Sequence, residues 1–227
     1  MNLKRLIVLF LFALVTSQSY ATVLFVTNGG DSGAGTLRDA IATSGIGDSV
    51  IINFKGAIAL TSPIQISGKD QLTIIGPYPV HNSFSAEGVS VPELFQIINS
   101  TNIVFKGLGF KHFFAASFDV RAAALINSGV SFVDCLFEGC QPNAGNGQGG
   151  ALSVENGSSV RLLGSSFYNN SSPNNGGAIY FDSTALFANI QSTSFIENTA
   201  VDSGGAVFIR YIPTTTVNFF VFNNNTF

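Results

Sequence analysis

The acidic side chains are the groups in this chain that could carry out catalysis. Hydrolysis of a glycosidic bond needs two carboxyl groups about 5–10 Å apart, and a lyase needs acidic calcium ligands beside a base that removes a proton. The thirteen acidic residues are scattered, with no Asp-Asp pair and no Arg-x-Lys sequence. Only a repeating fold would gather Glu155, Arg161 and Asp182 on one outward face. The preferred interpretation of these residues is an ordinary solvated polar surface.

The segment "GDSGAG", residues 30–35, contains two incomplete catalytic patterns. A serine protease with this Gly-Asp-Ser-Gly order has its histidine before the serine, whereas His81 and His112 both follow it. A phosphate-binding loop would continue with Lys, but Thr36 follows the last glycine. Neither histidine has a Cys, His or acidic partner at ligand spacing. The sequence therefore predicts no metal site and no cofactor.

Two cysteines, Cys135 and Cys140, are the only ones in the chain. They are five residues apart, and export would expose them to oxidation. A disulfide between them is one interpretation, and two small buried hydrophobic side chains are the other. Neither residue has the surroundings of a nucleophile.

Residues 1–21 have the features of a cleaved secretory signal. Lys4 and Arg5 precede the apolar run Leu6–Val15, and the small residues Ser19 and Ala21 lie just before the cleavage site. About ten apolar residues are too few to span a bilayer, and no later segment is longer. We expect an exported chain without a transmembrane helix in its mature form, located extracellularly, on the cell surface or outer membrane, or in the periplasm.

The composition favours a thin β structure. Without residues 1–21 the chain has eight basic and thirteen acidic residues, a net charge of −5. This charge argues against nucleic-acid binding, which depends on clustered Lys and Arg. Charged residues make up only 10% of the sequence, whereas it contains 24 Gly and 22 Phe. This balance is more typical of a β fold than of a helical globule.

The sequence repeats with a period near 27 residues. Gly-Gly-Ala begins at Gly149, Gly176 and Gly204, and Ala122–Leu125 reads as an imperfect earlier copy. Nine-residue blocks end at Phe110, Phe137, Phe167, Phe195 and Phe227. An apolar residue stands five positions before each of these phenylalanines. Since strand residues alternate between faces, two inward residues five apart require a corner or bulge between them.

A β-rich repeat of this length predicts a solenoid of parallel strands, about 4.8 Å apart. Its phenylalanines would stack as an internal ladder, and Asn170 and Asn198, three residues after Phe167 and Phe195, would stack likewise. The glycine pairs Gly176-Gly177 and Gly204-Gly205 would supply turn conformations that a Cβ forbids. We interpret these residues as structural rather than as binding residues.

Two sequence patterns resemble known families. The alternation of "GGAL", "FYNN", "GGAI", "FIEN" and "GGAV" resembles the repeats of chlamydial polymorphic outer-membrane proteins. Residues 26–41, "VTNGGDSGAGTLRDAI", resemble the opening of secreted bacterial right-handed β-helix proteins of the pectin lyase-like type. The first resemblance implies a β-helical passenger exported by a C-terminal barrel and used in adhesion. The chain departs from it at Cys140 and Phe113, which replace the repeat Asn, and in having no barrel-like end.

The predicted architecture is all-β: a right-handed parallel β-helix over residues 46–227, preceded by a capping strand and helix in residues 22–45. Thr36 and Asp39 would cap that helix at its N-terminus, and Leu37 and Ile41 would share its apolar face. Because the chain stops on Phe227, before the next turn, we expect a β-helix truncated at its C-terminal end, with a missing C-terminal anchor.

The predicted function is that of a non-catalytic exported scaffold, adhesin-like or autotransporter-passenger-like. Loops 141–148 and 171–175 would contact a host-cell surface or an extracellular glycan or protein. Since polysaccharide lyases and glycoside hydrolases also use the pectin lyase-like fold, a carbohydrate-active enzyme is the alternative. Fold alone does not decide between the two.

Overall fold

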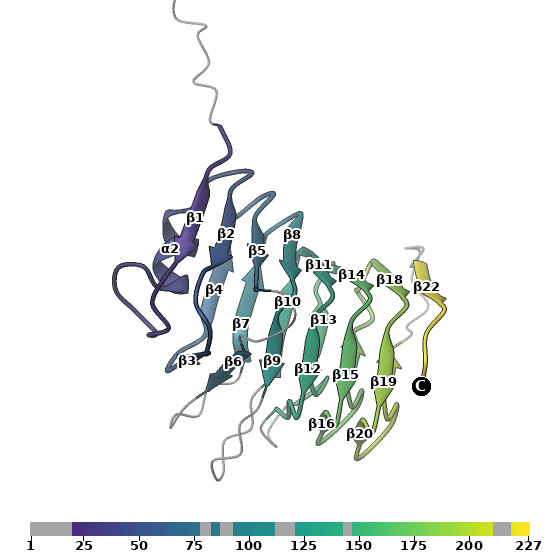
Figure 1. Cartoon of the computed structure of the whole chain (residues 1–227). Helices are drawn as coiled ribbons and strands as arrows, with labels where there is room; N and C mark the ends of the chain where they lie inside the picture. Colours follow the sequence, from purple (N-terminus) through teal and green to yellow (C-terminus); the bar gives the residue numbers. More distant parts are fainter. Residues whose placement is uncertain (1–19, 78–82, 87–92, 112–120, 143–146, 211–218) are drawn as a thin grey trace, which may run out of the picture.

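The computed structural model describes residues 20–77, 83–86, 93–111, 121–142, 147–210 and 219–227. In these ranges the chain winds as a parallel β-solenoid, with the strands of successive coils stacked along one axis (Figure 1). The predicted all-β class, with a capping strand and helix, is confirmed. Residues 1–19 of the predicted signal, together with His81 and His112, lie outside the described residues.

Three parallel sheets form the walls of the solenoid. Sheet A contains β1 (Val23–Val26), β2 (Ser49–Ile52), β5 (Thr73–Ile75), β8 (Ile103–Lys106), β11 (Gly129–Val133), β14 (Ser159–Leu163), β18 (Phe187–Gln191) and β22 (Phe219–Asn223). Sheet B contains β3 (Ala57–Leu60), β6 (Ser83–Ala86), β9 (Gly109–Lys111), β12 (Leu136–Glu138), β15 (Ser166–Tyr168) and β19 (Ser194–Ile196). Sheet C contains β4 (Ile64–Ser67), β7 (Glu93–Ile98), β10 (Arg121–Ile126), β13 (Leu152–Glu155), β17 (Ile179–Phe181) and β21 (Val207–Ile209).

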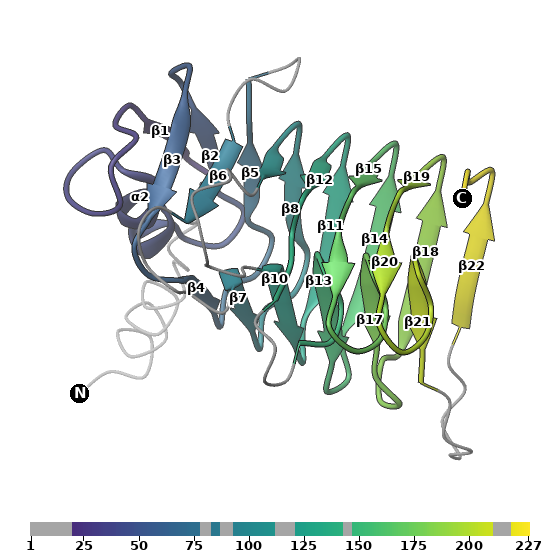
Figure 2. The same cartoon turned by 90° about the horizontal axis from the view of Figure 1, so that it is seen from below.

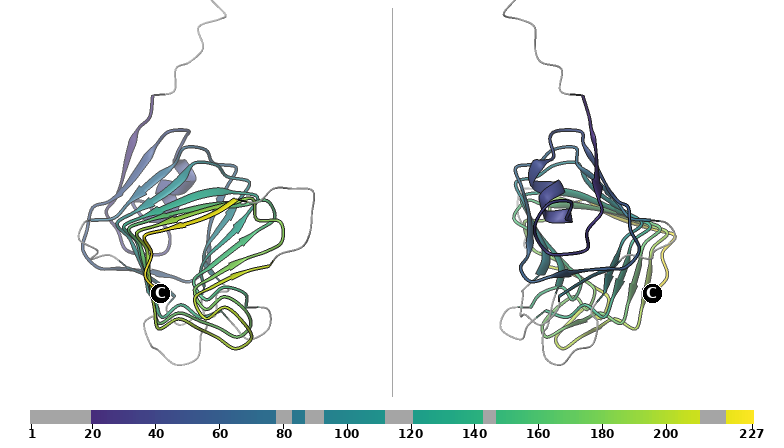
Figure 3. Two further views of the ribbon diagram at one scale, coloured as in Figure 1. Left: turned by 90° about the vertical axis from the view of Figure 1, so that its right-hand side faces the viewer. Right: turned by 60° about the vertical axis from the view of Figure 1, so that its left-hand side comes forward.

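Each coil passes from sheet A to sheet B to sheet C and then back to sheet A, which Figure 3 shows in end view. Strands β16 (Ser171–Ser172) and β20 (Thr199–Ala200) pair in a small fourth sheet between sheets B and C. Neighbouring strands in every sheet therefore come from successive coils. A side chain touches its counterpart one coil away rather than its neighbours in sequence.

Phenylalanine rings fill much of the interior between the sheets. The ring centroids lie 4.8 Å apart for Phe110–Phe137, 4.3 Å for Phe137–Phe167, 5.0 Å for Phe167–Phe195 and 5.1 Å for Phe195–Phe227. These separations are close to the strand spacing of about 4.8 Å, so flat rings can stack in successive coils without displacing the backbone. Pairing in sheet B keeps them in register, with Phe137 opposite both Phe110 and Phe167.

The predicted corner between the two inward residues of each block is present. Phe132 and Phe137 both point into the core, and Asp134 between them has a φ of 52°. This left-handed conformation breaks the alternation of the strand and turns the chain from sheet A to sheet B. The same corner recurs one coil later at Gly164 and two coils later at Ser192, with φ of 60° and 49°.

The Gly-Gly-Ala sequences form a bulge at the start of the sheet C strands. The backbone N–H groups of Ala151 and Leu152 both donate to the Ala178 carbonyl, at 2.8 and 3.0 Å. Those of Ala122 and Ala123 donate in the same way to the Ala151 carbonyl. Ala122 is thus the counterpart of Ala151, so the match of Ala122–Leu125 to Gly-Gly-Ala-Leu was wrong by two residues. The hydrogen bonds of the bulge, rather than the residue types, show which residues of successive coils are equivalent.

A cap closes the N-terminal end of the solenoid. The helix α2 (Leu37–Thr43) packs its buried Leu37 and Ile41 onto the first coil, at the near end of the right-hand view in Figure 3. The Thr36 hydroxyl accepts a hydrogen bond from the Asp39 N–H at 3.3 Å, as the sequence predicts. No helix in the described part of the chain is long and apolar enough to cross a membrane.

Candidate functional site

The structure separates the three charged residues that a repeating fold could have gathered on one face. Glu155 is the last residue of β13 and Asp182 directly follows β17, and these are neighbouring strands of sheet C. Arg161 lies on β14 of sheet A. Both Asp182 carboxylate oxygens are engaged in the turn: Oδ1 accepts from the Thr184 N–H at 2.8 Å and Oδ2 from the Asn156 N–H at 3.2 Å. Among the described residues no ion pair joins Arg161 to either acid. Glu155, Arg161 and Asp182, which the sequence offered only as the less favoured interpretation, therefore do not come together as a catalytic constellation.

Arg121, rather than Arg161, shares sheet C with Glu155 and with a second acid that the sequence did not suggest, and no ion pair joins these groups among the described residues. Glu93, Arg121 and Glu155 belong to β7, β10 and β13, three successive strands of sheet C, and Arg121 is opposite Glu93 in register. Burial raises the pKa of the Glu93 carboxyl, the Arg121 charge opposes this rise, and the Glu155 charge adds to it. Burial lowers the pKa of the Arg121 guanidinium, and the two carboxylates oppose that shift.

Hydrogen bonds extend this charged cluster along sheet C. Arg121 Nε donates to the Gly149 carbonyl at 3.2 Å, and the Ser153 hydroxyl donates to Glu155 Oε1. Gln96 Nε2 donates to Glu93 Oε1 at 3.2 Å. The cluster thus contains two carboxyl groups on strands two coils apart, and in register Glu155 pairs with Ile126, at the opposite end of β10 from Arg121. A buried acid with a raised pKa beside a second carboxylate is one requirement of glycoside hydrolysis.

One sequence signal could have identified Arg121. By the bulge alignment, Arg121 occupies the position of Gly150 and Gly177 in the next two coils. A Cβ at Gly150 would lie 1.9 Å from the Gly177 carbonyl oxygen. A charged residue at a glycine position of the repeat indicates that the backbone of this coil follows a different path at that position. Glu93 offered no such signal, because the repeat does not extend to its coil.

The repeat residues themselves point inward or shape the backbone. Asn170 Nδ2 donates to Asn198 Oδ1 at 2.9 Å and to the Phe137 carbonyl at 3.1 Å, and Asn170 Oδ1 accepts from the Cys140 N–H at 3.0 Å. Gly176 and Gly204 have φ of 71° and 69°. The Asn170 side chain is fully buried. These groups satisfy buried backbone between coils and leave no polar atom for a ligand.

Cys135 and Cys140 are both free thiols, so the structure does not contain the disulfide that the sequence left open. Cys135 Sγ contacts the Phe105 carbonyl at 3.5 Å, and Cys140 Sγ contacts the Phe110 carbonyl at 3.6 Å. The two side chains therefore stand in separate internal stacks at the two ends of β12. Burial raises the pKa of each thiol to about 12. Both behave as small buried side chains.

The loops predicted to make contacts project beyond sheet B. Residues 143–146 lie outside the described residues, but residues 171–175 and 199–203 form the projecting edge that includes β16 and β20 (Figures 1 and 2). Asn175 N–H donates to Gln148 Oε1 at 3.2 Å, which joins two successive coils there. Val201 is 76% exposed on this edge. The edge is thus a surface built from consecutive repeats.

Comparison with known proteins gives one short match. Residues 164–182 match the Chlamydia polymorphic membrane protein repeat. The matched segment runs from the corner at Gly164 through β15, β16 and β17, and it includes Phe167, Asn170 and Gly177. No curated protein matches the chain. The match therefore covers part of one coil of the solenoid, without its sheet A strand.

Proposed function

We propose that this chain is a non-catalytic β-helix scaffold, exported to the cell surface or outer membrane and used adhesively. The observation that carries this proposal is the overlap between the repeat match and the internal ladders. Within residues 164–182, Phe167 stacks between two rings, Asn170 bonds to the next coil, and the Cβ-free Gly177 permits close backbone contact. The repeat residues thus hold successive coils together, and the outward loops would make the contacts with other molecules.

Cell fractionation tests the location. An antibody raised against residues 22–227 would follow the protein through soluble, periplasmic and outer-membrane fractions. The proposal expects the antigen on the outer membrane and its loss when intact cells are treated with a protease. Antigen that stays protected in intact cells would contradict a surface role. The mass of the band also reports whether the native product is longer than this chain, as a passenger with an anchor would be.

Adhesion itself is tested on the projecting edge formed by residues 171–175 and 199–203. Purified chain should bind to host-type cells, and Val201→Asp should weaken that binding because it places a charge on an exposed apolar position. The matched control is Ile46→Asp, which introduces the same charge at a 63% exposed position near the N-terminal cap. Equal binding by the two variants would exclude this edge as the contact surface.

A carbohydrate-active enzyme is the second candidate, and the Glu93–Arg121–Glu155 cluster is the observation that favours it. In such an enzyme Glu93, with its raised pKa, would act as the acid. Glu155→Gln and Glu93→Gln should then each abolish the release of reducing ends from acidic polysaccharides. Asp182→Asn is the control, because its carboxylate serves a turn. Absence of turnover by the unmodified chain would remove this candidate.

A further inference from the structure

The outer face of sheet A contains a shallow groove that belongs to neither surface described above. Its volume is about 180 Å³, and its lining comes from β11, β14, β18 and Asn102. Gly129, Ser159 and Phe187 align across the three strands. Because the first two are small, Phe187 and Arg161 stand above them as walls. Phe187 is 37% exposed and Arg161 is also exposed, so both are accessible to a ligand.

Arg161 brings an uncompensated positive charge to this groove. It makes no hydrogen bond or ion pair within the described part of the chain, and no acidic residue lines the groove. In register it lies between Ser131 and Asn189. The buried Asn189 Oδ1 has no hydrogen-bond donor among the described residues.

We propose that the groove binds a sugar unit that carries a carboxylate. The Arg161 guanidinium would hold the carboxylate through paired N–H donors. The ring of Phe187 would pack on the apolar C–H face of the sugar, and the hydroxyls of Ser131 and Ser159 would contact its hydroxyl groups. The groove is smaller than sites for drug-sized ligands, which are about 300–1,000 Å³, so it accommodates a single ring.

An acidic peptide fits this surface less well. Peptides that bind sheets add a strand to an open edge and pair through their backbone. Strands β11, β14 and β18 are each paired on both sides, so the groove offers no unpaired strand edge. Recognition there must come from side chains alone. A compact ligand with one anionic group and an apolar face meets that requirement.

This inference rests on the proposed adhesive function, for which it supplies a ligand class, and it is tested by binding. Ligand-observed saturation-transfer NMR of the full exported chain would use glucuronate as the probe and glucose as its neutral match. We expect glucuronate to bind at least about ten-fold more tightly than glucose, because an ionic hydrogen bond is worth about 1.5–3 kcal/mol. Arg161→Gln should remove this preference, and Phe187→Ala should weaken binding of both sugars.

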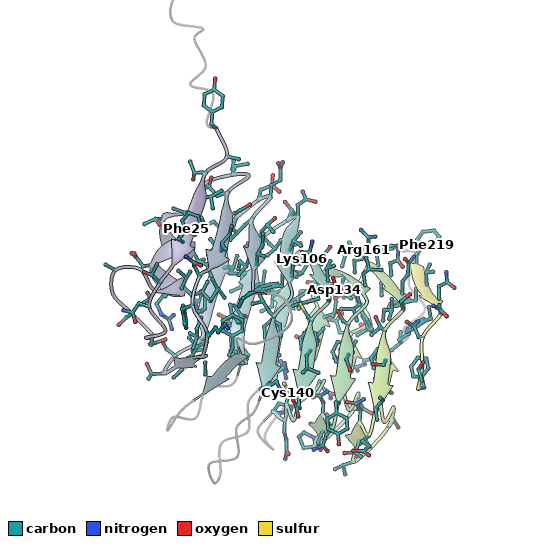
Figure 4. All side chains as sticks on the ribbon, viewed as in Figure 1. Phe25, Lys106, Asp134, Cys140, Arg161 and Phe219 are labelled. Atoms are coloured by element: carbon teal, nitrogen blue, oxygen red, sulfur yellow. The ribbon has the colours of Figure 1, made fainter. Side chains whose placement is uncertain are left out.

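The control is Lys106→Gln, which removes the same charge from the same sheet. Lys106 is exposed at the far end of β8, and Figure 4 shows it along the same side of the solenoid as Arg161. This variant should bind glucuronate as the unmodified chain does. Circular dichroism of each variant reports whether the fold is kept. Loss of binding in Lys106→Gln to the same extent would mean that only the general charge of the face matters, and would overturn the proposal.

Three other outcomes have separate meanings. If tri-glutamate or acetate competes as well as glucuronate, the groove is a simple anion site and the sugar proposal is wrong. If Arg161→Gln abolishes glucuronate binding but the protein in intact cells is protected from protease, the groove is supported as a binding site and the adhesive function is contradicted. If the chain adheres on the surface and glucuronate does not bind, the adhesive function stands and this inference is overturned.

Discussion

The first coil and the later coils use the same three sheets but have different interiors. The first coil is lined by aliphatic side chains, which are Val50, Ile52, Ile58, Leu60, Ile64 and Ile66. The later coils stack phenylalanines, with nearly parallel rings from Phe110 to Phe227. The aliphatic coil is closed by α2, whereas Phe227 at the other end is 70% exposed. In the later coils the ring ladder passes contacts from coil to coil.

The comparison shows what a repeated sequence contributes to stability. Each internal ring contacts a ring above and one below, so its contribution depends on its position in the stack as well as on its own burial. A ring at the end of the ladder makes half of these contacts. The same residue type in the same repeat position should therefore contribute very differently along the axis. The predictions below test this, from the largest expected effect to the smallest.

Phe137→Ala should give the largest loss of stability. Phe137 is fully buried and stacks on two rings, at 4.8 and 4.3 Å. Removing such a side chain costs about 3–5 kcal/mol of unfolding free energy. The control, Phe227→Ala, removes an exposed ring with one stacked neighbour and should cost much less. Urea unfolding followed by circular dichroism measures both, and equal losses would contradict the positional argument.

Gly177→Ala should be the next most damaging change. A Cβ at Gly177 would lie 1.8 Å from the Gly205 carbonyl oxygen, so the backbone of two coils would have to separate. Overpacking of this kind costs roughly 1–3 kcal/mol or more. In Gly205→Ala the nearest atom is the Asn198 carbonyl oxygen at 3.3 Å, and the cost should be small. If the thermal midpoints of the two variants agree, close contact between coils does not explain the repeated glycine.

Asn170→Asp should have a cost comparable with that of the glycine change. The substitution keeps the shape and removes both amide donors, which now bond to the Phe137 carbonyl and to Asn198 Oδ1. Unsatisfied buried groups cost about 1–3 kcal/mol each. Asn174→Asp is the matched control, because its single bond to the Gly147 carbonyl is long, at 3.3 Å, and only partly buried. Urea midpoints of the two variants should differ clearly.

The smallest expected effect is a loss of stability at low pH that originates near the N-terminal cap. Asp48 accepts hydrogen bonds from the N–H groups of Gly45 and Thr22, both at 2.7 Å, and these lower its pKa below 3.8. Because the folded-state pKa lies below the unfolded one, this stabilisation is complete above pH 3.8 and is lost as pH falls through the lowered value. Solvent screening keeps the effect small.

Thermal midpoints measured between pH 2 and 6 test the acid prediction. The unmodified chain should lose stability below pH 3.8, and Asp48→Asn should flatten that part of the profile. Phe137→Ala, a change in the ring ladder, should leave the shape of the acid profile unaltered. An unchanged profile in Asp48→Asn would mean that other carboxylates, such as Asp31 beside Arg38, dominate acid stability.

Much of the fold could be predicted from sequence because its determinants repeat along the chain. The spacing of Phe132 and Phe137 required a corner, and the structure has one at Asp134. Thr36 and Asp39 identified the capping helix. The charged cluster could not be predicted in the same way. The bulge at Ala122 and Ala151 shifts the alternation of faces, and coil lengths vary, since Ser49 pairs with Thr73 but Phe187 pairs with Phe219.

The sequence by itself determined the solenoid, its period, its ring ladder and its N-terminal cap. These features depend on neighbours in the chain and on identical residues meeting one coil apart. Only the tertiary structure decided that Arg121, not Arg161, lies in the same sheet as Glu155, that the two thiols stay apart, and that a groove opens over Gly129. Outward side chains have no such repeat to align them. Their positions depend on every turn that precedes them, and the lengths of the coils differ along the chain.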